Sequence, residues 1–407
     1  MLGLTLSGGG ARGSYQIGAW QAFRELNIEF QGVTGTSVGA LNGVLVAQND
    51  FDEAYNIWGN MTIDTVVDIN SEVLEKIRNF KSIKQDLPII YKEVRKTILE
   101  LGLDTQQLEK LIKKMLKEKK LRSEGKDFGL VTFSITDFKP LEVFLEDIPH
   151  GQLAEYLLAS AYLPIFKAKK LSGKLYLDGG VYNNLPLEML YRKGYRKIIT
   201  VKLQNRWIRK KEQHPKELEI IEIAPRMSLG NVLDFTKERA EFNLKLGYYD
   251  TMRVFKNLKG ARYYLSDKIS ESQALGFFMK LSEKSVKEMS VLFNLPQSMP
   301  INRLLMEEII PKIAKLMGLN AENTYPEVLL KLIESMAVSE SINPLYIFKT
   351  NDLLQETQRA YRKKNGIKKK QSAASQAYHD IVIRVDKDKM LGEAFEIILK
   401  GNKALRL

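Results

Sequence analysis

The stretch LGLTLSGGGARG, residues 2–13, decides the fold that we expect for this chain. Its apolar start is typical of a short strand, which ends at the glycines. In residues 14–26, apolar side chains recur every three or four positions, as on one face of a helix. A glycine-rich turn between strand and helix lets backbone N–H groups converge at a helix N-terminus, where the dipole favours negative charge. The turn is therefore expected to bind a phosphate or an oxyanion.

The same order of elements continues along the chain. Residues 30–36 form a second short strand candidate, and residues 38–48 form an apolar helix candidate. Strand, helix, strand and helix with short connections predict parallel strands joined by right-handed crossovers. Further strands are expected at residues 128–136, 141–145, 174–177, 197–203 and 218–223. The sequence therefore predicts an α/β fold with a mostly parallel central sheet.

The rest of the chain changes character. We expect an α/β domain over residues 1–226, with a Lys- and Glu-rich helical insertion at about residues 69–125. Residues 227–407 are expected to be mainly helical, with one late strand at 381–385 and a linker at 368–375. Helical periodicity in this region is clearest in residues 270–293, 304–317 and 328–336.

A second motif lies at the next junction of strand and helix. Residues 35–39 read GTSVG, the G-x-S-x-G pattern in which a sharp turn exposes the serine hydroxyl. Gly35 and Gly39 relieve the crowding of that turn, and the dipole of the following helix stabilises an alkoxide on Ser37. The alternative is that Ser37 only caps the helix.

A third motif follows the strand expected at 174–177. It consists of Asp178, Gly179 and Gly180, and its alternative interpretation is a plain turn, because Asp-Gly is a common turn pair. All three motifs come at the carboxyl ends of predicted strands, where ligands bind in open α/β sheets.

With these motifs the chain resembles the patatin-like phospholipase family. The resemblance rests on GGGAR at 8–12, GTSVG at 35–39 and DGG at 178–180, with softer matches at 159–166 and 183–186, and it covers about residues 2–225. It implies a three-layer α/β/α sandwich and a serine acylhydrolase with a Ser–Asp dyad, Ser37 and Asp178. Such an enzyme needs no metal and no organic cofactor.

The resemblance also implies a mechanism on lipid esters. Ser37 would attack the acyl carbonyl of a phospholipid or other lipid ester while Asp178 accepts its proton, which gives an acyl-enzyme. The oxyanion hole would come from the segment Gly8, Gly9, Gly10, Ala11 and Arg12. The residues that support the motifs would be Gly13, Gly35, Gly39, Gly179 and Gly180. Arg12 would either fix the loop and meet negative charge or form a structural salt bridge.

Few residues are available for other catalytic chemistry. The chain has no cysteine, which excludes a disulfide scaffold, a zinc-thiolate site and a cysteine nucleophile. Its three histidines, His150, His214 and His379, are expected at the surface or at helix caps. A dyad requires none of them.

The charge of the chain indicates its partners. Sixty-two Lys and Arg residues against 49 Asp and Glu residues give a net charge of +13, which favours anionic partners. No apolar segment approaches the roughly 20 residues of a membrane-spanning helix, and residues 2–6 begin a strand rather than a signal peptide. We expect a cytoplasmic protein that contacts anionic membranes peripherally; the sequence does not indicate its oligomeric state.

Two enzyme classes are alternatives. Gly8, Gly10 and Gly13 match the dinucleotide fingerprint of a Rossmann-type oxidoreductase, but Glu29 precedes the second strand, whose end should carry the acidic residue. An α/β-hydrolase would place several strands before the serine and a catalytic histidine after the acid. Here only one strand precedes Ser37.

The third alternative is a basic module that binds nucleic acid. Lysine and arginine runs occur in residues 113–122 and 362–370. Such runs are more often solvated helix faces, and no signature of a nucleic-acid-binding fold accompanies them. Clustered lysines also attract anionic lipid headgroups, so the lipid interpretation explains the same charge.

Overall fold

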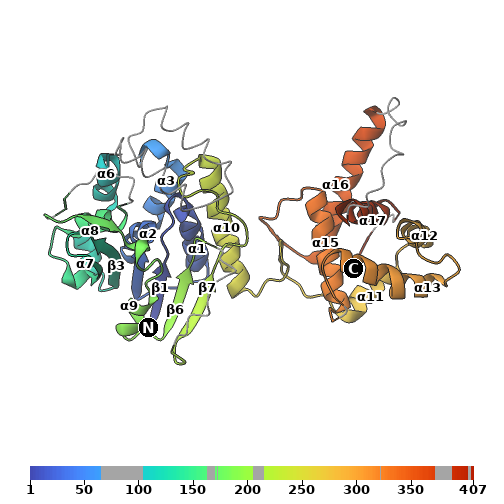
Figure 1. Cartoon of the computed structure of the whole chain (residues 1–407), viewed down its shortest axis with the longest axis horizontal. Coiled ribbons are helices and arrows are strands. Elements are labelled where there is room, and N and C mark those ends of the chain that lie inside the picture. Colours follow the sequence, from blue (N-terminus) through green and yellow to red (C-terminus); the bar gives the residue numbers. More distant parts are fainter. Residues whose placement is uncertain are drawn as a thin grey trace. The chain divides into compact units, whose positions relative to one another are not determined.

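The computed structural model describes residues 1–65, 104–162, 170–171, 173–204, 215–320, 322–371, 387–401 and 405–407. The chain forms two compact units, Met1–Val254 and Phe255–Leu407 (Figure 1). The first unit therefore extends beyond residue 226, where the sequence places the end of the α/β domain.

A seven-stranded sheet forms the centre of the first unit. Its order is β4-β3-β2-β1-β6-β7, and β5 pairs with β3 outside this path. β1 is parallel to β2 and β6, β2 to β3, and β6 to β7, whereas β4 and β5 run antiparallel to β3. The strands are β1 Leu2–Leu6, β2 Gly32–Thr36, β3 Asp127–Ser134, β4 Lys139–Phe144, β5 Tyr176–Asp178, β6 Lys197–Val201 and β7 Glu219–Ile223. The expected mostly parallel sheet is confirmed.

Helices cover both faces of this sheet. The position at which Gly43 of α2 would carry a Cβ lies 3.3 Å from Val33 on one face. On the other face, Leu190 of α9 approaches Gly3 and Gly32, where larger side chains would clash. The helices of the unit are α1 Ser14–Glu25, α2 Val38–Ala47, α3 Phe51–Asn60, α6 Gln106–Met115, α7 Glu118–Ser123, α8 Leu153–Ser160, α9 Leu187–Arg192 and α10 Lys237–Phe255. This arrangement is the expected three-layer α/β/α sandwich.

Close packing of α10 on α1 explains why the first unit continues past residue 226. A Cβ on Gly18 would lie 1.8 Å from the Leu244 carbonyl oxygen, and one on Gly247 would lie 1.9 Å from that of Tyr15. The two backbones thus meet at a glycine on each helix. The Tyr15 hydroxyl also donates to Asp250 Oδ2 at 3.0 Å. These contacts are not visible in the local periodicity of either segment.

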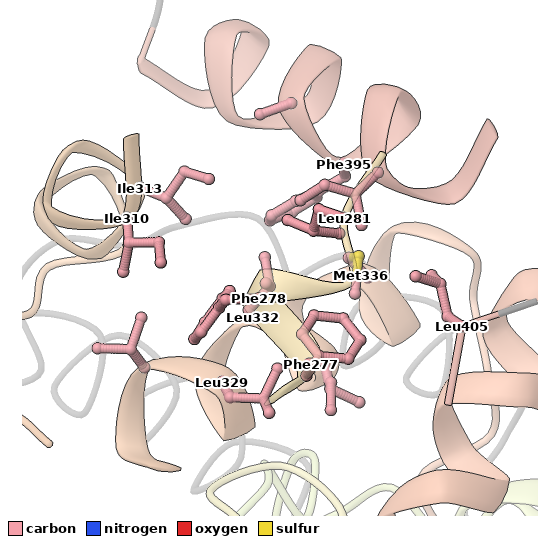
Figure 2. Packing of buried hydrophobic residues seen from close by; sticks show 14 of the residues in the cluster. Phe277, Phe278, Leu281, Ile310, Ile313, Leu329, Leu332, Met336, Phe395 and Leu405 are labelled. Atoms are coloured by element: carbon pink, nitrogen blue, oxygen red, sulfur yellow. The ribbon is translucent and has the colours of Figure 1, made fainter. Parts of the chain in front are cut away.

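The second unit is a helical domain with its own apolar core. Phe277, Phe278, Leu332, Met336 and Phe395 pack together in it (Figure 2). Its elements are β8 Tyr264–Leu265, α11 Glu271–Met279, α12 Glu283–Leu292, α13 Ile301–Arg303, the π-helical turn Leu304–Ile309, α14 Ile310–Leu316, α15 Tyr325–Ser339, β9 Ile347–Phe348, α16 Thr350–Gln371 and α17 Lys387–Gly401. The mainly helical character expected from the sequence is thus present in the described part of this unit.

Four details of this unit differ from the expectation or lie beyond the described residues. The helical periodicity of residues 270–293 belongs to two helices, because Ser282 caps a new helix and accepts a hydrogen bond from the Ser285 amide. The parallel pair β8–β9 has two residues per strand, too few for a sequence pattern. Helix α16 extends to Gln371 through the first half of the expected linker, and the expected strand at 381–385 lies outside the described residues.

In the part of the chain that the structure describes, no helix combines the length and the apolar character needed to cross a bilayer.

Candidate active site

The three sequence motifs meet at one edge of the sheet. The glycine-rich loop follows β1, Ser37 follows β2, and Asp178 ends β5. In the register of the sheet, Thr36 pairs with Val131 and Asp178 pairs with the next residue of β3, Thr132. The short strand β5 pairs only with the last three residues of β3, so it lies near the carboxyl ends of the parallel strands. This register places Asp178 beside the end of β2.

Ser37 occupies a strained turn between β2 and α2. Its backbone has φ 56° and ψ −128°, a positive φ that non-glycine residues rarely adopt. The turn is tight: a Cβ on Gly35 would lie 2.2 Å from the Gly39 carbonyl oxygen, and one on Gly39 would lie 2.3 Å from that of Leu6. The two glycines of the GTSVG motif therefore permit the close backbone approach that this conformation of Ser37 requires.

Ser160 fixes the backbone of this turn from the end of α8. Its hydroxyl accepts a hydrogen bond from the Ser37 amide at 3.0 Å and donates to the Val131 carbonyl at 2.6 Å. Ser160 is fully buried. It thus ties the position of Ser37 to strand β3, which also pairs with the strand of Asp178.

Asp178 has one engaged and one free carboxylate oxygen. Its Oδ1 accepts a hydrogen bond from the Gly180 amide at 2.7 Å, and its backbone amide donates to Tyr162 at 2.9 Å. Oδ2 is buried and has no hydrogen-bond partner of regular geometry. Ser37 nevertheless lies close enough for its side chain to act on this carboxyl group by hydrogen bonding. Catalytic hydrogen bonds are often long or poorly aligned in the absence of substrate.

Burial dominates the acidity of Asp178. It raises the pKa of the carboxyl group to about 6, against the lowering effects of Ser37 and of the Gly180 amide. A buried carboxylate is costly in its charged form, because water no longer solvates it. At neutral pH the group is mostly ionised, and its basicity is higher than that of an exposed aspartate.

The glycine-rich loop leaves two backbone donors unused. The amides of Gly8, Ala11 and Arg12 donate to Asn184, Val232 and Gly9 at 3.2, 2.8 and 3.3 Å. Within the described residues, the amides of Gly9 and Gly10 donate to no protein acceptor. Gly10 has φ +57°, and a Cβ there would lie 2.3 Å from the Val232 carbonyl oxygen. Two of the five expected oxyanion-hole residues thus have amides available for a ligand.

The loop is in contact with the other two motifs. A Cβ on Gly8 would lie 3.1 Å from that of Ser37 and 2.5 Å from Asn184 Oδ1. The Asn184 side-chain amide donates to the Gly8 carbonyl at 3.4 Å. Asn184 follows the Asp178 turn in sequence, so it connects the carboxylate segment with the glycine-rich loop.

Arg12 is half-buried and makes no salt bridge among the described residues. Its Nε donates to the Gly230 carbonyl at 2.9 Å, and burial lowers the pKa of the guanidinium. Of the two roles expected from the sequence, these contacts favour fixing the loop over a structural salt bridge.

An apolar cavity of about 70 Å³ opens beside Ser37. Helices α2, α3 and α6 and the segment 232–235 line it, chiefly with aliphatic and aromatic side chains. Its lining includes Leu41, Leu45, Trp58, Met115 and Phe235. This apolar lining suits a hydrocarbon chain.

The described part of the chain offers this site neither histidine nor metal ligands. His150 is exposed in the turn before α8, while His214 and His379 lie outside the described residues. In those same described ranges, no three carboxylate or imidazole groups converge as metal ligands.

Sequence reasoning missed the roles of Ser160 and Asn184. Both residues belong to the softer matches at 159–166 and 183–186, so their signal was present, but their partners are distant in the chain. The cavity was missed because its lining comes from six segments that are separate in the sequence. Residues 163–166 of the first soft match lie outside the described residues.

Comparisons with known proteins identify a family for the first part of the chain. Residues 4–191 match the family model described as patatin-like phospholipase. Patatin-like phospholipase domain-containing protein 7 of Rattus norvegicus is 24% identical over 297 residues, which cover 68% of this chain and 19% of that protein. Neuropathy target esterase sws of Drosophila melanogaster is 30% identical over 214 residues, covering 49% of this chain and 13% of that protein.

The chain thus spans about a fifth or less of the length of these curated relatives. Among solved structures, VipD from Legionella pneumophila is similar with a TM-score of 0.40 and 15% sequence identity, over 98% of this chain and 84% of that one. The family assignment rests on the family model and on the three motifs, not on this structural likeness. Residues 4–191 thus match the patatin-like phospholipase family as one domain of this chain.

Proposed function

We propose that this chain is a lipid acyl hydrolase that cleaves fatty-acyl esters of phospholipids or other lipids. The observation that carries the proposal is the buried Asp178 carboxyl group, whose Oδ2 has no partner of regular geometry next to the strained Ser37 turn. A buried carboxylate oxygen without a partner costs free energy. A substrate-bound state in which Ser37 donates its proton to Oδ2 provides the missing partner.

In the first step, the Ser37 oxygen attacks the acyl carbonyl carbon and its proton passes to Asp178. The carbonyl π electrons move to oxygen, and the amides of Gly9 and Gly10 donate to the resulting oxyanion. One such donor contributes a factor of about 10²–10³ to turnover. The tetrahedral intermediate collapses to an acyl-enzyme, and the proton on Asp178 goes to the departing alkoxide.

In the second step, water attacks the acyl-enzyme. Asp178 accepts the proton of the water, the second tetrahedral intermediate expels the Ser37 oxygen, and the serine regains its proton from Asp178. The fatty acid then leaves. A base with a pKa of about 6 is suited to this exchange near neutral pH, because it is mostly deprotonated yet more basic than an exposed aspartate.

The cavity beside Ser37 would bind the acyl chain. Its lining is apolar, and Ser37 itself lies on its wall, so an acyl chain in the cavity would place its carbonyl carbon next to the nucleophile. Burying each methylene contributes about 0.8 kcal/mol. We therefore propose preference for long-chain over acetyl esters.

The context of the glycine-rich loop counts against a dinucleotide site. The residue at the carboxyl end of β2 is Thr36, where the fingerprint requires an acidic side chain for the ribose. Three of the five loop amides from Gly8 to Arg12 already have protein acceptors. The net charge of +13 is consistent with a cytoplasmic enzyme that approaches anionic membranes, on which its substrates are present.

The proposal can be tested with a mixed phospholipid extract. Mass spectrometry of the products should show free fatty acids and the corresponding lysolipids with the wild-type chain and not with Ser37→Ala. It would also identify the headgroup and the acyl position that are cleaved. Equal product formation by Ser37→Ala would refute the assignment.

A further inference from the structure

The exposed apolar side chains of the first unit are gathered around the proposed site. Seven large apolar side chains are exposed in the described part of this unit. Two of them lie elsewhere and Tyr55 lies on helix α3, which lines the cavity, whereas four belong to segments that carry or contact the three motifs. These four, which we call the apolar rim, are Ile135, Phe138, Tyr182 and Val232.

Each rim segment is connected to the site. Tyr182 follows the Asp178 turn, and its amide donates to Gly179 at 3.0 Å. Val232 accepts the hydrogen bond of the Ala11 amide at 2.8 Å. Ile135 and Phe138 lie just beyond the carboxyl end of β3, whose residue Thr132 pairs with Asp178. The rim therefore lies on the same edge of the sheet as Ser37.

Phe138 is the most unusual member of the rim. It is 84% exposed at the tip of the turn between β3 and β4, and it has φ +50°. The other six non-glycine residues with positive φ in the described chain are Asn or Ser. A bulky side chain in this conformation is a genuine outlier, and such strain concentrates at functional sites.

Several contacts hold the turn in which Phe138 lies. The Asp137 amide donates to Ser134 Oγ at 3.1 Å, and the Lys174 ammonium pairs with the Asp137 carboxylate at 2.7 Å. The Phe138 ring rests edge-on against Phe133 with centroids 5.7 Å apart. The phenylalanine is thus presented to solvent by a fixed turn, in a position where asparagine or glycine would satisfy the backbone without strain.

Basic side chains accompany this tip. The described residues of segments 134–139 and 170–175, which are hydrogen-bonded to each other, carry Lys139, Lys170 and Lys174 against one carboxylate, Asp137. Lysines close to a membrane attract anionic headgroups, and aromatic side chains partition into the interface below them.

From these observations we propose that the apolar rim docks on an anionic phospholipid surface, with Phe138 inserted between the lipids. The inference rests on the proposed function, since a lipid surface is the partner that a site for membrane lipid esters must approach. Docking by this edge brings Ser37 and the mouth of its cavity to the bilayer. A lipid that enters the site then need not leave the membrane completely.

The absence of cysteine makes a direct test possible. In a Ser37→Ala background, which prevents hydrolysis of the vesicles, Phe138→Cys can be labelled uniquely with an environment-sensitive fluorophore. Val291→Cys is the matched control, because Val291 is an exposed apolar residue (69%) on helix α12. The vesicles contain phosphatidylcholine with phosphatidylglycerol, and phosphatidylcholine alone serves for comparison.

We expect the label at position 138 to brighten and shift to the blue with the anionic vesicles, and to be quenched by brominated acyl chains. The label at position 291 should not respond. Without label, Phe138→Ala and Phe138→Glu should lower the vesicle partition coefficient about tenfold or more, the effect of losing one buried aromatic side chain. Val291→Ala should leave it unchanged.

An unresponsive label at position 138, or partitioning of Phe138→Glu equal to that of its parent, would overturn the docking proposal. Because these measurements record binding alone, they separate the two proposals. Release of fatty acid by the wild-type chain, together with a silent label in the Ser37→Ala background, refutes only the docking. A responding label in that background, together with a wild-type chain that releases no fatty acid, refutes only the hydrolase assignment.

Discussion

Replacement of Asp178 by asparagine should stabilise the first unit at neutral pH while it abolishes hydrolysis. The carboxyl group is buried, and its charged form is destabilised by the loss of water. Asparagine has nearly the same shape, and its Oδ1 can still accept the Gly180 amide hydrogen bond that Asp178 Oδ1 accepts at 2.7 Å. The substitution thus removes a buried charge with little change in packing.

The magnitude follows from the pKa. Burial raises the pKa of Asp178 from 3.8 to about 6, so the folded state binds this proton more tightly than the unfolded state does. The contribution of this tighter proton binding to the stability of the folded state is fully present below pH 3.8 and is lost as the pH rises through 6. A shift of about two pKa units corresponds to about 3 kcal/mol. The free energy of unfolding of Asp178→Asn should therefore be about 3 kcal/mol higher than that of the wild type at pH 7. Below pH 4 the two values should be nearly equal.

Tryptophan fluorescence can follow this transition in the first unit alone. All three tryptophans of the chain, Trp20, Trp58 and Trp207, fall within residues 1–254. Urea unfolding of both proteins between pH 4 and 8 gives the difference in the free energy of unfolding at each pH. A difference that does not vary with pH, or a wild type more stable than the variant at pH 7, would refute the assignment of a raised pKa to Asp178.

Three further outcomes are expected. The kcat/KM for a soluble ester should fall about tenfold per pH unit below 6, because protonated Asp178 cannot accept the serine proton; a flat profile from pH 5 to 8 would contradict this role. Ser160→Ala removes the hydrogen bond from the Ser37 amide and the one to the Val131 carbonyl of β3. Steady-state kinetics should therefore show a lower kcat, and denaturation should show a free energy of unfolding lower by about 1–3 kcal/mol. An unchanged kcat would mean that Ser160 does not position the turn. Gly39→Ala should lower the melting temperature sharply, since its Cβ would lie 2.3 Å from a backbone oxygen. Gly43→Ala is the milder control, because its Cβ would lie 3.3 Å from the nearest atoms, which belong to side chains; equal melting temperatures would contradict the packing argument.

The main features of the first unit could be predicted from its sequence. Short apolar strands alternate with helices, and the strands before the three motifs are followed by glycine or a small polar residue. The parallel sheet and the location of the motifs at strand ends therefore follow from local patterns. Asp178 shows a limit of this reasoning. Its strand is antiparallel and three residues long, and only pairing with β3 places it beside Ser37.

Long-range packing accounts for most of what could not be predicted. Helix α10 belongs to the first unit because Gly18 and Gly247 let its backbone contact that of α1, which no local pattern reveals. The hydrogen bond from the Ser37 amide to Ser160 joins residues 123 positions apart. The exposure of Phe138 depends on the turn in which it lies, and an isolated phenylalanine in a sequence is more often a core residue.

The central claim is that Ser37 is a nucleophile activated by Asp178. A fluorophosphonate probe tests it most directly, because such a probe forms a stable covalent bond only with an activated hydroxyl group. Peptide mass spectrometry of the labelled wild-type chain should locate a single adduct on Ser37, with no adduct in Ser37→Ala and a much slower reaction in Asp178→Asn. An adduct on another residue, or equal labelling rates in the wild type and Asp178→Asn, would contradict the claim.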